Sequence, residues 1–214
     1  MPSLLLIRHA QASYGAADYD VLSDRGHEQV AALHAALEAR GARADRLVSG
    51  GLRRQRDTAA PFGGELRIDD RWDEYDAADL LTAHSPSGAR LEGGALSSHD
   101  FQPILDRAML DWIAAGEEGP ADETWPMFRD RVDGALREAL ESLGKGETGL
   151  VFTSGGVIAC ACVLVLGIDP AALPLLNRTS VNGSVTKLIS GGRGVSLVTF
   201  NEHAHLEPDL VTFR

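Results

Sequence analysis

Short apolar runs alternate with longer amphipathic stretches along this chain. Four of the runs predict strands, at residues 3–8, 46–49, 65–68 and 149–153. Between the first two runs, Val30, Leu33 and Leu37 recur at helical spacing and predict a helix with one buried face. Ser23 is a typical N-cap for this helix, and Gly41 is a typical residue at which it ends.

The same pattern continues through the second half of the chain. Further helices are predicted at residues 52–60, 101–114, 124–143 and 155–166, with Thr124 as the cap of the third and with Pro61 and Gly167 ending the first and last. Two late strands, at 184–189 and 196–200, flank a glycine-rich hairpin signal. Strands that alternate with helices predict an α/β fold, a three-layer α/β/α sandwich whose mostly parallel sheet has an antiparallel edge.

The length of the chain fits one domain. Its 214 residues are too few for two domains of ordinary size, so residues 1–214 are expected to form a single unit. Between residues 70 and 119 the pattern loosens, and prolines and glycines cluster at 86–94. We interpret residues 76–125 as an insertion or lid over one end of the sheet.

Composition excludes several classes of partner. With 20 basic and 31 acidic residues the net charge is −11, which disfavours binding to nucleic acid or to anionic membranes. The chain has no apolar run long enough for a membrane span, and a cytoplasmic protein is expected. Cys160 and Cys162 lie inside an apolar run, which predicts small buried side chains rather than a disulfide or a metal pair.

Arginine is the one residue type whose placement suggests chemistry. Of the 20 basic residues, 18 are Arg, an excess that compositional bias explains for most of them. The ends of three predicted strands nevertheless carry Arg8-His9, Ser49 shortly before Arg53-Arg54, and Ser154-Gly155 at a helix start. If these ends share one sheet edge, the Arg side chains and helix amides form a phosphate site with a nucleophilic His. Each piece alone also fits a solvated helix face, a tight turn or a structural His.

Five segments in this order resemble the histidine phosphatase superfamily, whose fold is phosphoglycerate mutase-like. Residues 6–12 resemble the family's strand followed by Arg-His-Gly, and residues 22–29 its Leu-Thr-x-x-Gly-x-x-Gln helix start. Residues 49–59 are similar to its Ser-Pro-Leu-x-Arg-x-x-x-Thr-Ala segment. Residues 72–75 resemble the segment of the acidic proton donor, and residues 151–158 the turn that usually reads Ser-His-Gly-Gly.

The resemblance implies a role for each matching residue. His9 attacks phosphorus and carries a phosphohistidine, while Arg8 and Arg54 hold the phosphoryl oxygens. Glu74 protonates the leaving oxygen and then activates water, although it also fits a surface carboxylate in an acidic loop. Ser154 and Gly155 fall at the phosphate-binding turn. The scheme needs no metal and no cofactor.

Two positions depart from the family pattern. Ala10 stands where Gly is usual, which is a minor change. Ser154 stands where the family has its second pocket His, so a cationic donor becomes a neutral hydroxyl. The loss of such a contact costs about 2–4 kcal/mol in a transition state. Arg53 and His205 are the main candidates that would compensate for it, and Arg56 and His203 are further ones.

Three functions fit these residues. The favoured one is a metal-independent phosphatase that hydrolyses a small-molecule phosphomonoester. The alternative is a phosphate-ester-binding member of the same fold, with weak or no turnover because of Ser154. A phosphoglycerate mutase is a weaker fit, because mutases of the family retain both His. The acidic residues of the insertion disfavour a highly anionic substrate. The strand at 196–200 would lie at a sheet edge, where it allows a homodimer.

Overall fold

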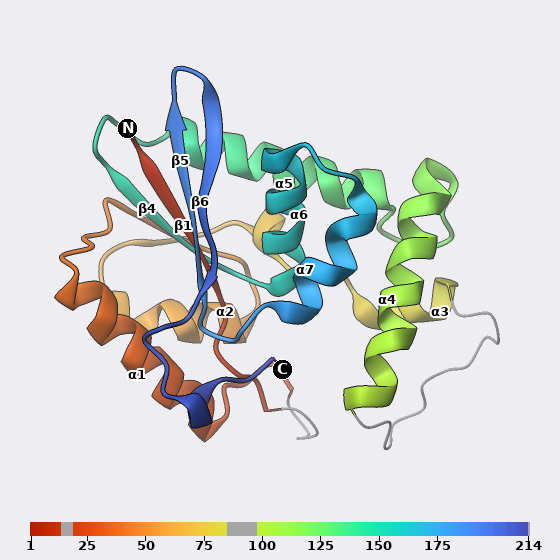
Figure 1. The fold of residues 1–214 in the computed structure, drawn as a ribbon, viewed down its shortest axis with the longest axis horizontal. Helices are drawn as coiled ribbons and strands as arrows, with labels where there is room; N and C mark the ends of the chain where they lie inside the picture. Colours follow the sequence, from red (N-terminus) through yellow and green to blue (C-terminus); the bar gives the residue numbers. More distant parts are fainter. Residues whose placement is uncertain (14–18, 85–97, 214) are drawn as a thin grey trace.

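One mixed sheet organises the molecule. The computed structural model describes residues 1–13, 19–84 and 98–213 (Figure 1). Among these residues the sheet has the order β3-β2-β4-β1-β5-β6. The strands are β1 (Ser3–Arg8), β2 (Arg46–Ser49), β3 (Leu66–Ile68), β4 (Thr148–Thr153), β5 (Val185–Gly191) and β6 (Gly194–Glu202). The first four run parallel, and β5 and β6 add an antiparallel edge, as predicted.

Helices cover both faces of the sheet (Figure 1). They are α1 (Asp24–Ala39), α2 (Arg53–Ala59), α3 (Ala77–His84), α4 (Ser98–Ala115), α5 (Trp125–Glu141), α6 (Gly155–Leu166) and α7 (Leu173–Thr179). Side chains alternate along a strand, so Leu5 and Ile7 of β1 pack with α1, while Leu4 and Leu6 join the larger core under α5 and α6. The predicted three-layer α/β/α sandwich is therefore confirmed.

Most of the helices begin and end at the residues that the capping signals predicted. The Ser23 hydroxyl accepts a hydrogen bond from the Gly26 amide at 3.1 Å, and α1 stops before Gly41, whose φ is +65°. Helix α6 ends at Gly167, whose φ of 61° is left-handed and suits glycine. At α2 the prediction needs a correction. The helix ends at Ala59, and Pro61 lies inside a following 3₁₀ turn because its fixed φ suits that turn.

The region around the predicted insertion is more regular than its sequence suggests. Helix α3 was not predicted, and α4 begins at Ser98, three residues before the predicted start. Both helices lie at one end of the molecule, to the right in Figure 1. The proline and glycine cluster that marked the insertion, at residues 86–94, lies outside the described residues. A lid function for residues 76–125 stays a prediction.

The cysteines are buried as predicted. Cys160 and Cys162 lie free on α6 inside the larger core, and burial raises the pKa of each thiol to about 12. Within the described ranges, no cluster of His, Cys, Asp and Glu could hold a metal ion. No helix in these ranges is both long and apolar enough to cross a bilayer.

Candidate active site

The carboxyl ends of β1, β4 and β2 meet at one edge of the sheet. Arg8 is level with Thr153 and Ser49 with Phe152 in the parallel ladders. Just beyond these ends, the His9 amide donates a hydrogen bond to the Thr153 carbonyl at 2.8 Å. The structure thus brings together the three strand ends that the sequence analysis singled out.

His9 is buried with a defined tautomer. Its side chain is 5% exposed, and Nδ1 lies 2.8 Å from the Ala10 carbonyl, which can only accept, so Nδ1 carries the proton. Nε2 accepts a hydrogen bond from the Arg54 Nε at 3.2 Å. Burial, followed by the charges of Arg54 and Arg8, holds the pKa of His9 well below its usual range. The imidazole is therefore neutral at pH 7, and its Nε2 lone pair faces the Arg54 Nε–H.

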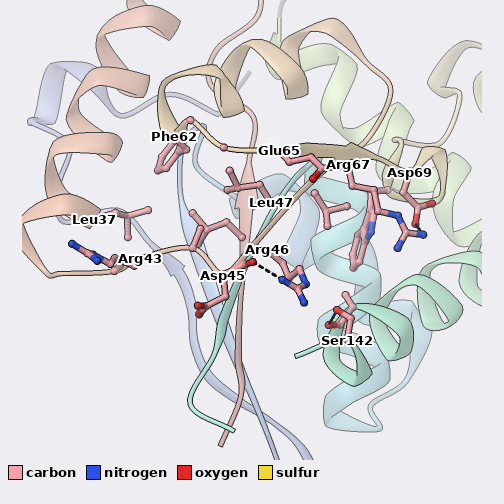
Figure 2. Close-up of a pocket in the computed structure, with 18 of the residues that line it drawn as sticks. Leu37, Arg43, Asp45, Arg46, Leu47, Phe62, Glu65, Arg67, Asp69 and Ser142 are labelled. Carbon is pink, nitrogen blue, oxygen red and sulfur yellow. Dashed lines mark hydrogen bonds and ion pairs between the residues drawn. The ribbon is translucent and has the colours of Figure 1, made fainter. Parts of the chain in front are cut away.

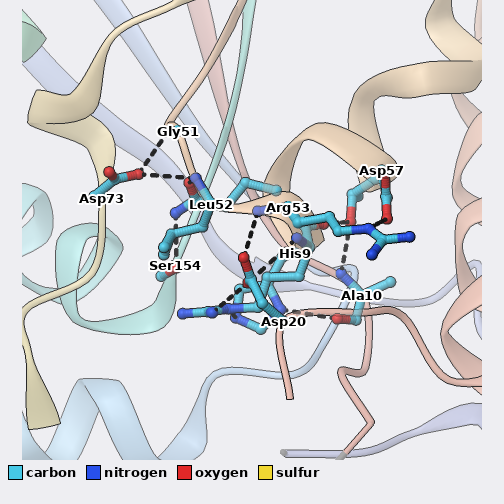
Figure 3. Close-up of polar contacts among 12 residues, drawn as sticks. His9, Ala10, Asp20, Gly51, Leu52, Arg53, Asp57, Asp73 and Ser154 are labelled. Atoms are coloured by element: carbon cyan, nitrogen blue, oxygen red, sulfur yellow. Dashed lines mark hydrogen bonds and ion pairs between the residues drawn. The ribbon is translucent and has the colours of Figure 1, made fainter. Parts of the chain in front are cut away.

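Arg54 links His9 to an acidic residue that the sequence analysis missed. The Arg54 Nη1 donates to the Asp20 carboxylate at 2.6 Å, and the same carboxylate accepts the Arg53 amide at 2.6 Å (Figure 3). Asp20 thereby fixes both the guanidinium and the start of α2. No local signal marks Asp20, because it lies in the loop before α1 and meets α2 only through the fold.

Arg8 lies on the other face of β1. Its Nη1 donates to the Ser180 carbonyl and its Nη2 to the Phe213 carbonyl, the latter at 3.0 Å. The Nε is buried without a hydrogen-bond partner among the described residues, and burial lowers the Arg8 pKa. Gly155 allows this close packing, because a Cβ there would lie 3.4 Å from the Arg8 Nε and 2.7 Å from the Asn177 Oδ1.

Glu74 reaches the start of α6. Its Oε2 accepts the Gly156 amide at 3.0 Å, while Oε1 is buried and unpaired within the described part of the chain. Burial raises the pKa of Glu74, and the Gly156 hydrogen bond and the charges of Arg54 and Arg8 offset part of this rise. Glu74 thus lies in the field of both site arginines instead of in a solvated acidic loop. A carboxyl with a raised pKa is suited to giving and taking a proton near neutral pH.

Ser154 is fully buried at the N-terminus of α6. Its Oγ accepts a hydrogen bond from the Gln55 Nε2 at 2.9 Å, and Gln55 is fully buried as well. The sequence analysis missed Gln55. The signal that would have found it is its position next to Arg54, on the short helix that faces the strand ends.

The two main auxiliary candidates, Arg53 and His205, contact groups other than Ser154. The Arg53 side chain is 52% exposed, and its Nε lies 3.5 Å from the Asp57 carboxylate. His205 uses its Nε2 to donate to the Gly183 carbonyl at 3.1 Å, and burial lowers the His205 pKa. In the described part of the chain, no hydrogen bond joins His205 to Ser154. The geometry gives His205 no direct part in replacing the missing charge.

A groove of about 990 Å³ lies elsewhere on the molecule, between α1, β2, β3 and α5 (Figure 2). Its lining includes Leu37, Leu47 and Phe62 together with the charged side chains of Arg67 and Asp69. None of the candidate site residues is among those that line it. The groove is thus separate from the strand-end site.

Comparison with known proteins gives a family and a fold. The profile of the histidine phosphatase superfamily, branch 1, matches residues 4–203. A search of curated proteins found no significant match. A solved phosphoserine phosphatase mutant from Entamoeba histolytica, in complex with phosphoserine, superposes with a TM-score of 0.71 at 18% identity, over 97% of this chain and 100% of that one. A mycobacterial glucosyl-3-phosphoglycerate phosphatase gives a TM-score of 0.69 at 23% identity, over 94% and 99% of the two chains. The phosphoglycerate mutase-like fold is therefore confirmed.

Proposed function

The chain belongs to the histidine phosphatase superfamily, and from this premise we propose that it hydrolyses a small-molecule phosphomonoester through a phosphohistidine on His9, without a metal. One observation carries the proposal. The neutral imidazole of His9 presents its Nε2 lone pair to the Arg54 guanidinium, 3.2 Å away, in a buried site that also contains Arg8 and Glu74. A nucleophile, cationic oxygen ligands and a proton donor are the parts that phosphoryl transfer requires.

The first step forms the phosphohistidine. When the ester binds, the Arg54 Nε–H passes from Nε2 of His9 to a phosphoryl oxygen, which frees the Nε2 lone pair. The lone pair attacks phosphorus, and the bond between phosphorus and the ester oxygen breaks. Arg54 and Arg8 hold the nonbridging oxygens as negative charge shifts onto them. Protonated Glu74 gives its proton to the leaving oxygen, so the alcohol departs neutral. The proton on Nδ1 of His9 stays on its hydrogen bond to the Ala10 carbonyl.

The second step returns the enzyme to its starting state. Glu74, now a carboxylate, takes a proton from a water molecule, whose oxygen attacks phosphorus. The bond between phosphorus and Nε2 breaks, inorganic phosphate leaves, and Glu74 is again protonated. One carboxyl suffices for both steps, because Glu74 is deprotonated by the first step and protonated again by the second.

A small substrate agrees with the named relatives. The two structural relatives described above are phosphatases of phosphoserine and of glucosyl-3-phosphoglycerate, and both names describe small phosphate esters. The net charge of −11 argues against nucleic acid and anionic membranes as partners. We therefore place the substrate among small phosphomonoesters of a soluble, cytoplasmic pool.

One observation favours the runner-up function, a phosphate-ester-binding protein with little turnover. Ser154 is neutral where the family has a second His, and His205 makes no hydrogen bond to it in the described residues. The two functions differ in turnover alone, because both bind a phosphate ester at His9 and Arg54.

The decisive experiment compares the wild type with His9→Ala. We expect the wild type to hydrolyse p-nitrophenyl phosphate in the presence of EDTA, and His9→Ala to lose this activity entirely. Mass spectrometry after an alkaline quench should find a phosphoryl group on the peptide that contains His9, since phosphohistidine is labile in acid. The exposed His27→Ala serves as the matched control and should behave as the wild type.

Activity that survives in His9→Ala would end the phosphohistidine mechanism for this chain. Absence of turnover in the wild type, together with calorimetric binding of inorganic phosphate, would support the binding protein instead.

A further inference from the structure

Arg54 and Gln55, which are adjacent on α2, contact the residues that follow two adjacent strands, β1 and β4. Side chains on one face of β4 pack toward α1 and α2 at Leu150 and Phe152, and Ser154 continues this alternation. His9 continues the same face of β1 after Ile7. As a result Arg54 contacts His9 and the next residue, Gln55, contacts Ser154. The two pairs lie side by side because β1 and β4 are adjacent and in register.

The orientation of the Gln55 amide is determined by its partners. Its Oε1 accepts the Leu52 amide at 3.3 Å, an interaction that only an oxygen can make. Its Nε2 then donates to the Trp72 carbonyl at 3.2 Å and to the Ser154 Oγ at 2.9 Å. Every hydrogen of the amide has a partner, and Gln55 is fully buried. The Ser154 oxygen is therefore an acceptor in this pair.

Packing keeps the amide in this position. A Cβ on Gly50 would collide with the Gln55 Oε1 and with the Asp73 carboxylate, so the glycine leaves room for both. Asp73 accepts the Gly51 amide at 2.7 Å, which anchors the turn that leads into α2 (Figure 3). The carboxamide of Gln55 is thus enclosed by backbone on one side and by Ser154 on the other.

An acceptor role leaves the Ser154 proton free for another group. A hydroxyl has one hydrogen to donate, and no acceptor for it is found among the described residues. A fully buried hydroxyl without an acceptor costs free energy, which a ligand oxygen would recover. Next to Ser154 at the same level of the sheet lies His9, the residue on which the phosphoryl group would sit.

We propose that Gln55 is a positioning residue, which turns the Ser154 hydroxyl into a neutral hydrogen-bond donor toward the phosphoryl group on His9. The proposal rests on the proposed function and deepens it. The amide holds the oxygen lone pair, and the O–H then points into the site. A neutral donor adds no further positive charge beside Arg8 and Arg54, and it does not titrate near neutral pH.

The test uses substitutions that separate this role from packing. Ser154→Ala removes the donor, and Gln55→Met removes the amide at similar volume. Gln55→Glu places a carboxylate opposite Ser154, so the hydroxyl donates to it and turns away from the site. We expect Ser154→Ala and Gln55→Glu each to lower kcat about 100- to 1000-fold with a small change in KM, as for the removal of one transition-state donor. The double variant Gln55→Met/Ser154→Ala should lose no more than Ser154→Ala alone.

The fully buried Gln29 offers a matched control. It donates to the Leu210 carbonyl and makes no contact with Ser154, so Gln29→Leu should lower Tm without this pattern in kcat. The proposal would be overturned if the fold-losses in kcat of the two single substitutions multiplied in the double variant. It would also be overturned if Gln55→Glu and Ser154→Ala lowered Tm and left kcat unchanged.

A second readout does not depend on turnover. Orthovanadate adopts the geometry of phosphoryl transfer. Its Kd should rise in Ser154→Ala and in Gln55→Glu. In the double variant Gln55→Met/Ser154→Ala the Kd should rise no more than in Ser154→Ala alone. An unchanged Kd in Ser154→Ala would overturn the role of Ser154 even if the wild type does not hydrolyse esters. Activity that survives in His9→Ala would instead contradict the proposed function and leave the vanadate result unchanged, so the two failures are distinguishable.

Discussion

His9 is kept neutral by the residues that would bind its substrate. The Arg54 and Arg8 guanidinium groups and the burial of the ring all disfavour a proton on Nε2. A second His that shared the site would add positive charge to this field when protonated. The Ser154 hydroxyl is neutral and adds no such charge, and the hydrogen bond from the Gln55 amide orients this hydroxyl. At this scale the site replaces a cationic donor by an oriented neutral one.

The low pKa of His9 predicts how stability changes with pH. In the unfolded chain a His titrates near its usual pKa of about 6.5. The folded pKa lies well below this, so between the two values the unfolded state binds more protons. The free energy of unfolding should therefore fall as the pH drops below about 6.5, by up to about 1.4 kcal/mol per pH unit from this residue. Urea denaturation of wild type and His9→Asn between pH 7.5 and 5.5 measures the difference.

His9→Asn should lose less stability than the wild type over this range. The exposed His27→Asn is the control and should follow the wild type. Parallel curves for wild type and His9→Asn would mean that the folded protein protonates His9 as readily as the unfolded chain does.

The start of α6 positions several site residues at once. Its first two residues, Gly155 and Gly156, lack side chains where Arg8, Glu74 and Tyr75 pack against the helix. The Gly156 amide donates to the Glu74 carboxylate, so the helix also holds the proposed acid. The two glycines are visible in the sequence, and the structure shows which side chains occupy the space that a Cβ would take.

Gly156→Ala tests this element. A new Cβ would collide with Glu74 and lie 2.5 Å from the Tyr75 ring, so the segment around Glu74 must shift. We expect a loss of about 1–3 kcal/mol in stability. Hydrolysis should fall further for alkyl phosphates than for p-nitrophenyl phosphate, because a poor leaving group depends on the acid. Gly192→Ala, where a Cβ meets nothing within 4 Å, is the control. Equal losses for both esters would show that Glu74 is not the proton donor.

Elements with strong local signals were predictable from the sequence. The four parallel strands, α1 and α6 follow from apolar periodicity and from caps such as Ser23 and Gly167. Helices α3 and α7 were missed because they have only eight and seven residues, too few to show an apolar period. A start signal was present at α3, where the Asp76 carboxylate accepts the Ala78 amide at 2.8 Å and the Asp79 amide at 3.0 Å. Long helices carry the periodicity that makes a prediction possible, and short ones are stabilised by their tertiary contacts.

Part of the site was predictable from strand ends, and the family resemblance added Arg54 and Glu74. Arg8, His9 and Ser154 follow directly from the rule that ligands bind beyond the carboxyl ends of parallel strands. Asp20 and Gln55 were not predictable, since each acts through a partner that is distant in sequence. Gln55 and Ser154, for example, are 99 residues apart. Such pairs depend on the register of the sheet and on the position of α2.

At the scale of the whole molecule, the predicted insertion and the sheet share one hydrophobic core. Leu80 of α3 and Met109 and Trp112 of α4 belong to the same buried cluster as Leu6 and Val151 of the central strands. An element packed into the common core cannot unfold without exposing the sheet. We therefore expect the described parts of the insertion to unfold together with the rest of the domain.

A single cooperative transition is therefore expected on denaturation. Trp112 and Trp125 are buried against each other beside α4, and Trp72 is buried next to the groove between β2, β3 and α5, so their fluorescence reports on the core at both places. Fluorescence and far-UV circular dichroism should give the same urea midpoint. Met109→Ala removes a fully buried side chain of α4 and should lower the stability by about 2–5 kcal/mol, with both midpoints shifting together. The exposed Met127→Ala is the matched control, with little change expected. A fluorescence transition that precedes the loss of helix signal would instead show that the insertion unfolds as a separate unit, which is the behaviour expected of a lid.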